Sequence, residues 1–356
     1  MREAHDSPLH ERHSPLSILK SKMTRNQIPS DILAVCKLPD INAGHRIVGP
    51  ITALCMHPNE RWVLASGCNQ QAFIFSSDQI RRQVLFSIKI PDFKIVDACF
   101  VDSGRKVLLL GNHENLMIWS LLDQKIETFI FPGHRDQKWT SLKASPCHRF
   151  LALSGDGCRI AIFDTSSLLL RKVLKTNSRN IVTTFSGDGS FLFSAGTESR
   201  VYIWETRCFD CLRIFTDDAG TQITCLSSSL NCQFLAVGAN TGILNLYEIS
   251  SVMEAHESKV KPFKCFENLI TKITSIEFHP SSELLAYSSP DKYGALRIIH
   301  IPSRRVYSNW PKEKTPIFHS HRIQFDHDGA LFYVGNEKGI VTSYGLIHYM
   351  SLTSTA

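Results

Sequence analysis

The stretch that decides the fold runs from Ile51 to Phe75 and reads Ile51-Thr-Ala-Leu-Cys-Met56-His-Pro58, then Trp62-Val-Leu-Ala-Ser-Gly67, then Ala72-Phe-Ile-Phe75. Three short runs of apolar, β-branched and aromatic residues are separated by turn residues, which is typical of antiparallel β-strands. Read alone, this stretch would predict no more than an ordinary hairpin with a neighbouring strand.

The same pattern recurs six more times, at residues 95–119, 139–163, 181–204, 223–247, 273–300 and 323–344. We anchor each copy on the last residue of its first run, and the anchors are then 44, 44, 41, 42, 51 and 47 residues apart. A period of roughly 40 to 45 residues is that of a four-stranded propeller blade. The chain is therefore predicted to be an all-β, seven-bladed β-propeller. The anchors are Met56, Phe100, Ala144, Phe185, Ser227, Phe278 and Phe325.

Each copy supplies three strands, so the fourth strand of a blade is expected between copies, for example at residues 124–130 and 211–215. One further β-like run, residues 32–38, precedes the first copy, and the chain ends soon after the last copy. We predict that residues 32–38 form the outer strand of the last blade, beside residues 341–346. This closure would remove the exposed sheet edge at which the ring would otherwise stay open.

The domain organisation expected from this pattern is simple. Residues 1–30 form a disordered tail, residues 31–350 the propeller, and residues 351–356 a C-terminal tail. The first tail carries two Ser-Pro sites, Ser7 and Ser14, which are candidate phosphorylation sites. The sequence contains neither an apolar run long enough to span a bilayer nor a secretory signal, so an intracellular protein is expected.

Charge and cysteine content exclude several classes of protein. The net charge of +6 is only mildly basic, which permits contact with nucleic acid without requiring it. The eleven cysteines are an odd number and several lie in apolar runs, so reduced thiols are expected. Cys208 and Cys211 form a lone C-x-x-C without a second pair, and no metal or other cofactor is predicted.

Two groups of basic residues are candidate contacts for RNA phosphate or for an acidic partner. The first group lies in the longest interruption of the repeat, residues 248–268, and the second in the outer region of the sixth copy. A solvated surface loop is the simpler interpretation of the first group. The candidates are Lys259, Lys261, Lys264, Arg304, Arg305, Lys312 and Lys314.

No catalytic set can be assigned. The histidines are scattered through predicted turns, without a histidine pair and carboxylate at the spacing of a metal site or a catalytic triad. No phosphate-binding glycine loop or paired acid motif is present, and no charged or metal-binding set can be assigned to the central channel. A protein without enzymatic activity is predicted. The turn histidines are His57, His113, His148, His279 and His327.

Trp119, Trp204, the pair Gly133-His134 and the glycine that ends most second runs resemble the WD-repeat superfamily. The match is degenerate, since no copy keeps the Trp-Asp dipeptide and Gly-His precedes only the third copy. The superfamily's buried hydrogen bonds from His to Asp are thus largely missing, and stability is expected from apolar packing between blades. The repeat positions with an expected structural role are Gly67, Gly111, Trp119, Gly155, Gly196, Trp204, Gly238 and Gly335.

A more specific resemblance is to the U3 small nucleolar RNA-associated protein 18 family, carried by residues 34–58, 93–100, 261–280, 296–303, 306–311 and 334–339. It implies a non-catalytic scaffold of the nucleolar small-subunit processome, which processes the precursor of 18S ribosomal RNA. The implied partners are propeller proteins of the B subcomplex, the U3 particle and pre-ribosomal RNA. Family members commonly carry a long charged N-terminal extension that recruits an exosome-associated RNA helicase. The short tail departs from that pattern, so the resemblance does not extend to this recruitment.

A competing interpretation is a substrate receptor of a cullin ubiquitin ligase. It rests on Trp204-Glu-Thr-Arg207, which approximates the Trp-Asp-x-Arg motif of propeller receptors. A phosphoinositide-binding propeller would need Phe-Arg-Arg-Gly, which neither residues 80–83 nor residues 303–306 match. Copurification with U3 RNA or with a cullin adaptor would separate the first two functions.

Overall fold

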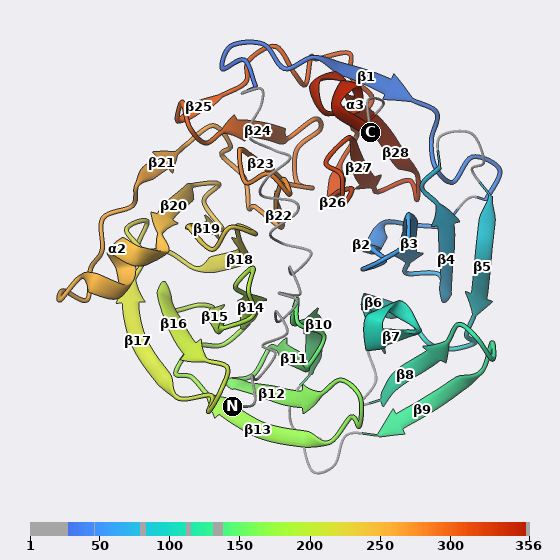
Figure 1. Ribbon diagram of the computed structural model, residues 1–356, viewed down its shortest axis with the longest axis horizontal. Coiled ribbons are helices and arrows are strands. Elements are labelled where there is room, and N and C mark those ends of the chain that lie inside the picture. Colours follow the sequence, from blue (N-terminus) through green and yellow to red (C-terminus); the bar gives the residue numbers. More distant parts are fainter. Residues whose placement is uncertain (1–27, 46, 79–82, 112–114, 131–137, 354–356) are drawn as a thin grey trace, which may run out of the picture.

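The computed structural model (Figure 1) describes residues 28–45, 47–78, 83–111, 115–130 and 138–353, and it describes side chains as far as Met350. Ser7, Ser14 and nearly all of the expected N-terminal tail lie outside the described residues. The same holds for His113 and for the pair Gly133-His134.

Seven four-stranded antiparallel sheets surround a central axis, which confirms the predicted seven-bladed propeller (Figure 1). Blade 1 consists of β2 (Ile51–Met56), β3 (Trp62–Gly67), β4 (Gln71–Ser76) and β5 (Val84–Lys89). Blade 2 consists of β6 (Ile95–Val101), β7 (Lys106–Gly111), β8 (Asn115–Ser120) and β9 (Ile126–Ile130), with a 3-10 turn, η1 (Asp102–Gly104), between β6 and β7. Blade 3 consists of β10 (Trp139–Ala144), β11 (Phe150–Gly155), β12 (Arg159–Asp164) and β13 (Leu170–Lys175).

The remaining blades follow in chain order. Blade 4 consists of β14 (Val182–Phe185), β15 (Phe191–Ala195), β16 (Arg200–Glu205) and β17 (Cys211–Thr216). Blade 5 consists of β18 (Ile223–Ser228), β19 (Phe234–Ala239), β20 (Leu244–Glu248) and β21 (Lys264–Phe266). Blade 6 consists of β22 (Ser275–Phe278), β23 (Leu284–Ser288), β24 (Leu296–His300) and β25 (Arg305–Val306). Blade 7 consists of β26 (Ser320–Phe325), β27 (Leu331–Asn336), β28 (Val341–Leu346) and β1 (Val35–Leu38).

The N-terminal strand closes the ring as predicted. β1 pairs antiparallel with β28, with Val35 opposite Leu346, and the blue first strand lies beside the dark red last strand in Figure 1. The strand begins at Val35 and not at Ile32. Leu33 uses its N–H and its carbonyl in hydrogen bonds with the side-chain amide of Asn309, at 3.1 and 2.8 Å, so these backbone groups are not available to the ladder.

The longest interruption of the repeat is more ordered than a surface loop. It contains the helix α2 (Ile249–Glu254) and ends in β21, the outer strand of blade 5. Ile249 and Val252 are three residues apart on one face of α2 and both are buried between blades 4 and 5. The interruption is therefore partly helix and strand, while its three lysines, Lys259, Lys261 and Lys264, are exposed.

Both ends of the propeller extend past their expected boundaries. Ile28 is only 4% exposed and packs into the cluster between blades 6 and 7, so ordered packing begins before residue 31. At the other end, α3 (Ile347–Thr353) crosses the expected boundary at residue 350. Its Tyr349 is also 4% exposed and joins the same cluster.

Apolar packing between neighbouring blades holds the ring together. The buried hydrophobic residues form seven clusters, and each cluster joins two adjacent blades. Trp119 lies in the cluster between blades 1 and 2, and Trp204 in the cluster between blades 3 and 4. The second strand of a blade is covered on both faces, which is why β11 is buried at every position and reads as a continuous apolar run.

The repeated glycines have a steric role. A Cβ on Gly155 would lie 1.9 Å from the carbonyl oxygen of Lys138, and one on Gly67 would lie 2.4 Å from the Ile47 side chain. At all six repeat glycines a Cβ would come within 2.7 Å of another atom. These positions let the segment before a first strand pass close to the end of a second strand. The six are Gly67, Gly111, Gly155, Gly196, Gly238 and Gly335.

Turn histidines tie consecutive blades together. Nε2 of His57 donates to the carbonyl of Gly104 in blade 2 at 3.2 Å, while Nδ1 accepts the N–H of Glu60 at 2.9 Å. His279 repeats the arrangement toward Gly329 of blade 7 at 3.0 Å.

Within the described part of the chain, no helix is long and apolar enough to cross a membrane.

Candidate interaction surfaces

The rim of blades 5 and 6 brings together residues from both predicted basic groups. The turn that ends at Arg304 is closed by its N–H, which donates to the carbonyl of Ile301 at 3.0 Å. The guanidinium carbon of Arg304 then lies 3.9 Å from the centroid of the Phe263 ring. Phe263 stands between Lys261 and Lys264, both exposed. We call Lys261, Phe263, Lys264 and Arg304 the rim patch.

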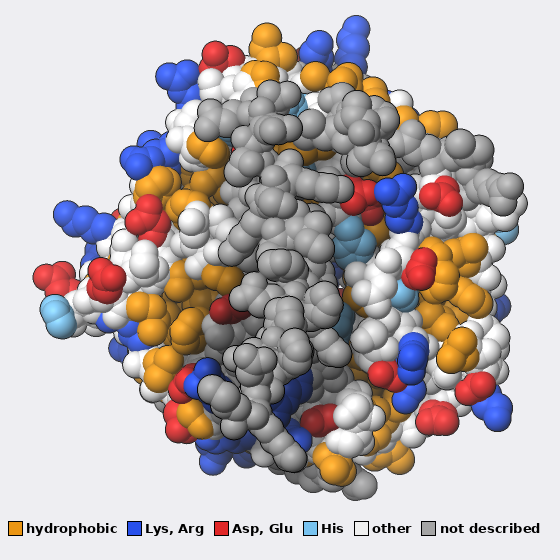
Figure 2. All heavy atoms as spheres, viewed as in Figure 1, with side chains coloured by type: hydrophobic (Ala, Val, Ile, Leu, Met, Phe, Trp, Pro, Cys, Tyr) orange, Lys and Arg blue, Asp and Glu red, His pale blue; other side chains and the backbone are white. Residues whose placement is uncertain are grey.

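Local packing positions the rim patch. Phe263 lies 5.4 Å from Phe234, centroid to centroid, and packs against the cluster between blades 5 and 6. Lys264 is the first residue of β21 and pairs with Leu246 of β20. Lys and Arg side chains gather on the rim over β21 and β25 in Figure 2. The patch combines an aromatic ring with three cations, which suits a flexible nucleic-acid strand.

The other four predicted basic residues do not join this patch through any contact in the described residues. Lys259 forms an ion pair with Asp218 at 3.2 Å, and Arg305 forms one with Asp31 at 3.4 Å. Lys312 and Lys314 are exposed in the connection between blades 6 and 7. The charges of Lys259 and Arg305 are thus partly neutralised.

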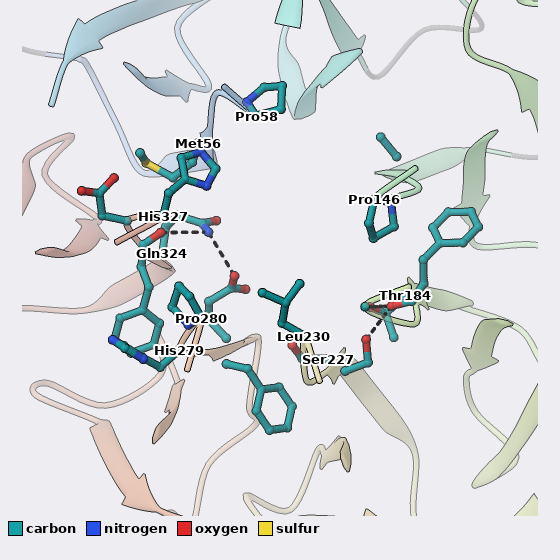
Figure 3. A pocket seen from close by; sticks show the side chains of 18 of the residues that line it. Met56, Pro58, Pro146, Thr184, Ser227, Leu230, His279, Pro280, Gln324 and His327 are labelled. Carbon is teal, nitrogen blue, oxygen red and sulfur yellow. Dashed lines mark hydrogen bonds between the residues drawn. The ribbon is translucent and has the colours of Figure 1, made fainter. Parts of the chain in front are cut away.

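A second surface surrounds the central channel, where a cavity of about 600 Å³ opens on the side of the turns between first and second strands. One equivalent position of the first strands, the residue before Met56 in blade 1, lines this cavity in five of the seven blades. Thr184, Ser227 and Gln324, from three different blades, line the cavity in Figure 3. The seven equivalent residues are Cys55, Cys99, Lys143, Thr184, Ser227, Glu277 and Gln324.

This ring of positions corrects the repeat anchor in blade 5. Ser228 pairs with Leu235, the second residue of β19, just as Met56 pairs with Val63, the second residue of β3. Ser228 and not Ser227 is therefore equivalent to Met56. Residues 227–229 are three consecutive serines, so no apolar residue marked the end of the first run and fixed the register of the repeat in blade 5.

Two charged groups of the channel were missed in the sequence. Burial raises the pKa of Glu277 to about 7, although Lys143 opposes the shift and Gln324 donates a hydrogen bond to its Oε1 at 3.0 Å. The expectation that no charged set converges on the channel is thus wrong. The sequence did contain a signal for these two residues, because Lys143 and Glu277 both stand directly before a repeat anchor and so occupy equivalent positions. Among the described residues, no group of three His, Cys, Asp or Glu side chains could hold a metal ion.

The tetrapeptide Trp204-Glu-Thr-Arg207 is largely part of the fold. Trp204 is 7% exposed and its Nε1 donates to Ser194 Oγ at 2.8 Å. Thr206 is buried as well, and its hydroxyl donates to the carbonyl of Gly189 at 2.7 Å. Of the four residues, only Arg207 is exposed. This arrangement adds no support to the ubiquitin-ligase interpretation.

Comparison with known protein families finds the WD domain, G-beta repeat, at residues 37–76 and 170–205. The first match starts within β1 and continues through the three inner strands of blade 1. The second starts with β13 of blade 3 and ends with β16 of blade 4. Each sequence repeat therefore links the outer strand of one blade to the inner strands of the next.

The chain is also similar along most of its length to curated proteins. It is 30% identical to the human U3 small nucleolar RNA-associated protein 18 homolog over 92% of this chain, and 30% identical to the Arabidopsis thaliana homolog over 93%. It is 25% identical to the Saccharomyces cerevisiae U3 small nucleolar RNA-associated protein 18 over 90% of the chain. The chain spans 59%, 60% and 62% of the lengths of these three relatives.

Proposed function

Since this chain is a WD-repeat propeller related to the U3 small nucleolar RNA-associated protein 18 family, we propose that it is a scaffold of the small-subunit processome in the nucleolus. In this role it has no catalytic activity of its own and is required for processing the precursor of 18S ribosomal RNA, and so for ribosome biogenesis. Its partners are other propeller proteins of the B subcomplex, the U3 particle and pre-ribosomal RNA.

The observation that carries the proposal is the extent of the similarity. An alignment over 92% of the chain at 30% identity includes all seven blades, not only the repeat motif that unrelated propellers share. The name of that relative associates it with U3 small nucleolar RNA. Fold alone would not support this function, because propellers serve many unrelated ones.

The geometry supports docking and not catalysis. The equivalent first-strand positions other than Lys143 and Glu277 carry hydroxyl, amide and thiol groups, and burial raises the pKa of Cys55 to about 12. A thiol with a raised pKa is a poor nucleophile. The broad faces and rim of a propeller remain as surfaces for partners, and the rim patch is our proposed contact with RNA.

Among the predicted contacts we assign the main RNA role to Lys261, Lys264 and Arg304, since the Arg304 guanidinium lies over the Phe263 ring and the two lysines flank Phe263 in the sequence. Lys259, Arg305, Lys312 and Lys314 are proposed as weaker, peripheral contacts. The two ion pairs, with Asp218 and Asp31, leave less charge for phosphate at Lys259 and Arg305. Exposed ion pairs are weak, so phosphate can compete with them.

The test is immunoprecipitation of the tagged full chain, followed by identification of the associated RNA and proteins. We expect U3 RNA, precursor ribosomal RNA and propeller proteins of the B subcomplex. Imaging should place the tagged chain in the nucleolus. A variant with Lys261→Gln, Lys264→Gln and Arg304→Gln should retain its protein partners and lose crosslinks to precursor RNA.

A matched control is the double variant Lys312→Gln with Lys314→Gln, which removes exposed charge outside the rim patch. It should keep most of the crosslinks. Recovery of a cullin-linked adaptor without U3 RNA would refute the processome role and favour the ubiquitin-ligase interpretation. Unchanged crosslinking in the triple variant would refute only the role of the rim patch.

A further inference from the structure

The outer strand of blade 2, β9, has an unpaired backbone edge on the rim of the ring (Figure 1). The N–H of Ser120 donates to the carbonyl of Lys125 at 3.0 Å, and from there alternate residues of β9 face β8. The N–H and carbonyl groups of Ile126, Thr128 and Ile130 therefore point away from the sheet. Within the described residues these groups have no hydrogen-bond partner. Such an edge can pair with another strand.

The side chains beside this edge are mostly apolar. Ile126, Thr128 and Ile130 lie on one face of β9, because side chains alternate along a strand. Ile126 is 43% exposed and Ile130 is 66% exposed. Across the ladder, Ile126 lies opposite Trp119 and Thr128 lies opposite Met117, so this face continues the cluster between blades 1 and 2. β9 thus presents apolar side chains next to unpaired backbone groups.

Two of the other outer strands carry charges that discourage pairing. β13 of blade 3 contains Arg171, Lys172 and Lys175, and β5 of blade 1 ends in Lys89. Charged side chains, lysine above all, and proline protect natural edge strands. β9 has none of these, since its one charged residue is Glu127. Its edge is therefore open to a partner strand.

The chain itself shows what kind of group occupies an outer edge. On blade 4, the N–H of Thr216 at the outer side of β17 donates to the carbonyl of Ser258 at 2.7 Å, within a parallel bridge between Thr216 and Lys259. On blade 6, residues 29–33 lie against the outer region, where the Tyr307 hydroxyl donates to the carbonyl of Pro29 at 2.8 Å. In both places the occupant is a polypeptide segment from outside the blade.

We propose that β9 binds an extended segment of a protein partner, which pairs with it as a fifth strand of blade 2. A row of outward N–H and carbonyl groups is matched by the backbone of another strand. Apolar side chains at alternate positions of that segment meet Ile126 and Ile130, and a basic side chain meets Glu127. RNA does not fit, because the exposed charges at β9 and its turn are the carboxylates of Asp123 and Glu127 against one ammonium, that of Lys125.

A second copy of the chain is not the occupant. β9 has five residues and spans about 17 Å, so pairing two rigid propellers edge to edge would bury far less than the about 1,200 Å² of a stable interface. A flexible segment can add to such a short edge while the rest of its chain binds elsewhere. This inference goes beyond the proposed RNA contact and does not depend on it.

The probe is a fluorescein-labelled peptide, Gly-Ser-Val-Lys-Val-Lys-Val-Ser-Gly, added to the purified full chain and followed by fluorescence anisotropy. Two matched peptides carry N-methyl groups either on the valines or on the lysines, so each lacks the N–H donors along one edge of the strand. Thr128→Pro removes an outward N–H and leaves the inner ladder intact. Ser87→Pro is the control, since the N–H of Ser87 also points outward, from β5.

We expect the peptide to bind, and we expect Thr128→Pro to weaken binding at least about tenfold. Ser87→Pro should leave binding unchanged. One methylated peptide should lose binding and the other should keep it, because only one edge of the added strand faces β9. A cooperative thermal transition verifies that Thr128→Pro folds. If it does not, the double variant Ile126→Lys with Ile130→Lys takes its place and should weaken binding as much, since lysine protects an edge.

The proposal is overturned if the peptide does not bind at about 1 mM, if the two methylated peptides bind alike, or if a folded edge variant binds like the parent. Displacement of the peptide by oligouridine would place RNA on this edge and would overturn the assignment to a protein. Sedimentation velocity of the chain alone tests the remaining occupant. A dimer that Thr128→Pro dissociates would identify a second copy and would likewise overturn the proposal.

Discussion

The side-chain amide of Gln324 donates a hydrogen bond to Oε1 of Glu277 at 3.0 Å, and this bond joins the innermost strands of blades 6 and 7. Burial raises the pKa of Glu277 to about 7 from its ordinary 4.5, which means that the folded protein binds a proton there more tightly than the unfolded chain. The carboxylate of Glu277 therefore lowers stability at alkaline pH.

Glu277→Gln should accordingly be more stable than the parent at about pH 8, by on the order of 1 to 3 kcal/mol. The folded-state pKa is raised, so this side chain's favourable contribution is complete below pH 4.5 and is lost as the pH rises through about 7. Urea unfolding at about pH 5 and pH 8 measures the difference. An equal difference in free energy of unfolding between the parent and the variant at the two pH values would contradict the prediction. Glu313→Gln, which removes an exposed carboxylate in the connection between blades 6 and 7, is the control.

His279 should have the opposite effect on the pH dependence of stability. Burial lowers its pKa to about 4, so between pH 4 and 6.5 the unfolded chain binds a proton that the folded protein does not. The free energy of unfolding should fall as the pH drops through this window. His279→Gln should flatten that slope and lose about 1 to 3 kcal/mol at neutral pH, because the bond to Gly329 is removed.

The control for that experiment is His256→Gln, since His256 is exposed just after α2. It should leave both the slope and the stability at neutral pH unchanged. An identical slope for the parent and for His279→Gln would show that His279 is protonated in the folded protein. The stacked ring of Tyr349, with its centroid at 4.0 Å, would then have to accommodate a cation.

Trp204→Ala should lower the free energy of unfolding by about 3 to 5 kcal/mol. The indole is 7% exposed between blades 3 and 4, so truncation leaves a cavity and removes the donor to Ser194. Trp204→Phe keeps much of the buried surface and should lose less. Denaturant unfolding measures both values. A loss near zero for Trp204→Ala would mean that the indole is not packed between blades.

Deleting residues 28–40 should abolish the closure of the ring. The deletion removes β1 and so exposes the edge of β28, and it also removes Ile28 and Leu33 from the cluster between blades 6 and 7. We expect a protein that aggregates or unfolds without a single cooperative transition. Sedimentation velocity and thermal melting test this. A monomeric variant with one sharp transition would contradict the role of β1.

Most of the fold could be predicted from the repeat pattern, for a physical reason. Second strands are covered by blades on both sides, so their apolar runs and final glycines are visible in the sequence, as in Leu151 to Gly155. The outer strand of blade 7 was predictable because Ile32 to Leu38 had no other partner. The helix α2 was not, since six residues without a capping side chain give little local signal.

The candidate surfaces were harder to predict because they depend on residues that are distant in the sequence. Phe263 and Arg304 are 41 residues apart, and only the packing of blade 5 against blade 6 places one over the other. Asp326 and Glu277 are separated by 49 residues and meet at one cavity through the ring geometry. The repeat predicted which positions of the seven blades are equivalent. It did not predict that the first-strand position of Glu277 lines the channel cavity.

The rim patch leads to the last prediction, which concerns the salt dependence of RNA binding. If Lys261, Lys264 and Arg304 each contact a phosphate of a single strand, the three contacts together release about two counterions. Replacing all three by Gln should reduce the slope of log affinity against log salt by about 2 and weaken binding to every sequence alike. Phe263→Ala should behave differently, because it removes the ring on which the Arg304 guanidinium lies and leaves all three positive charges in place. Its affinity should fall at all salt concentrations with an unchanged slope. Anisotropy titrations with an oligouridine at several salt concentrations separate the two effects, and a triple variant whose slope equals that of the parent would show that phosphate is bound elsewhere.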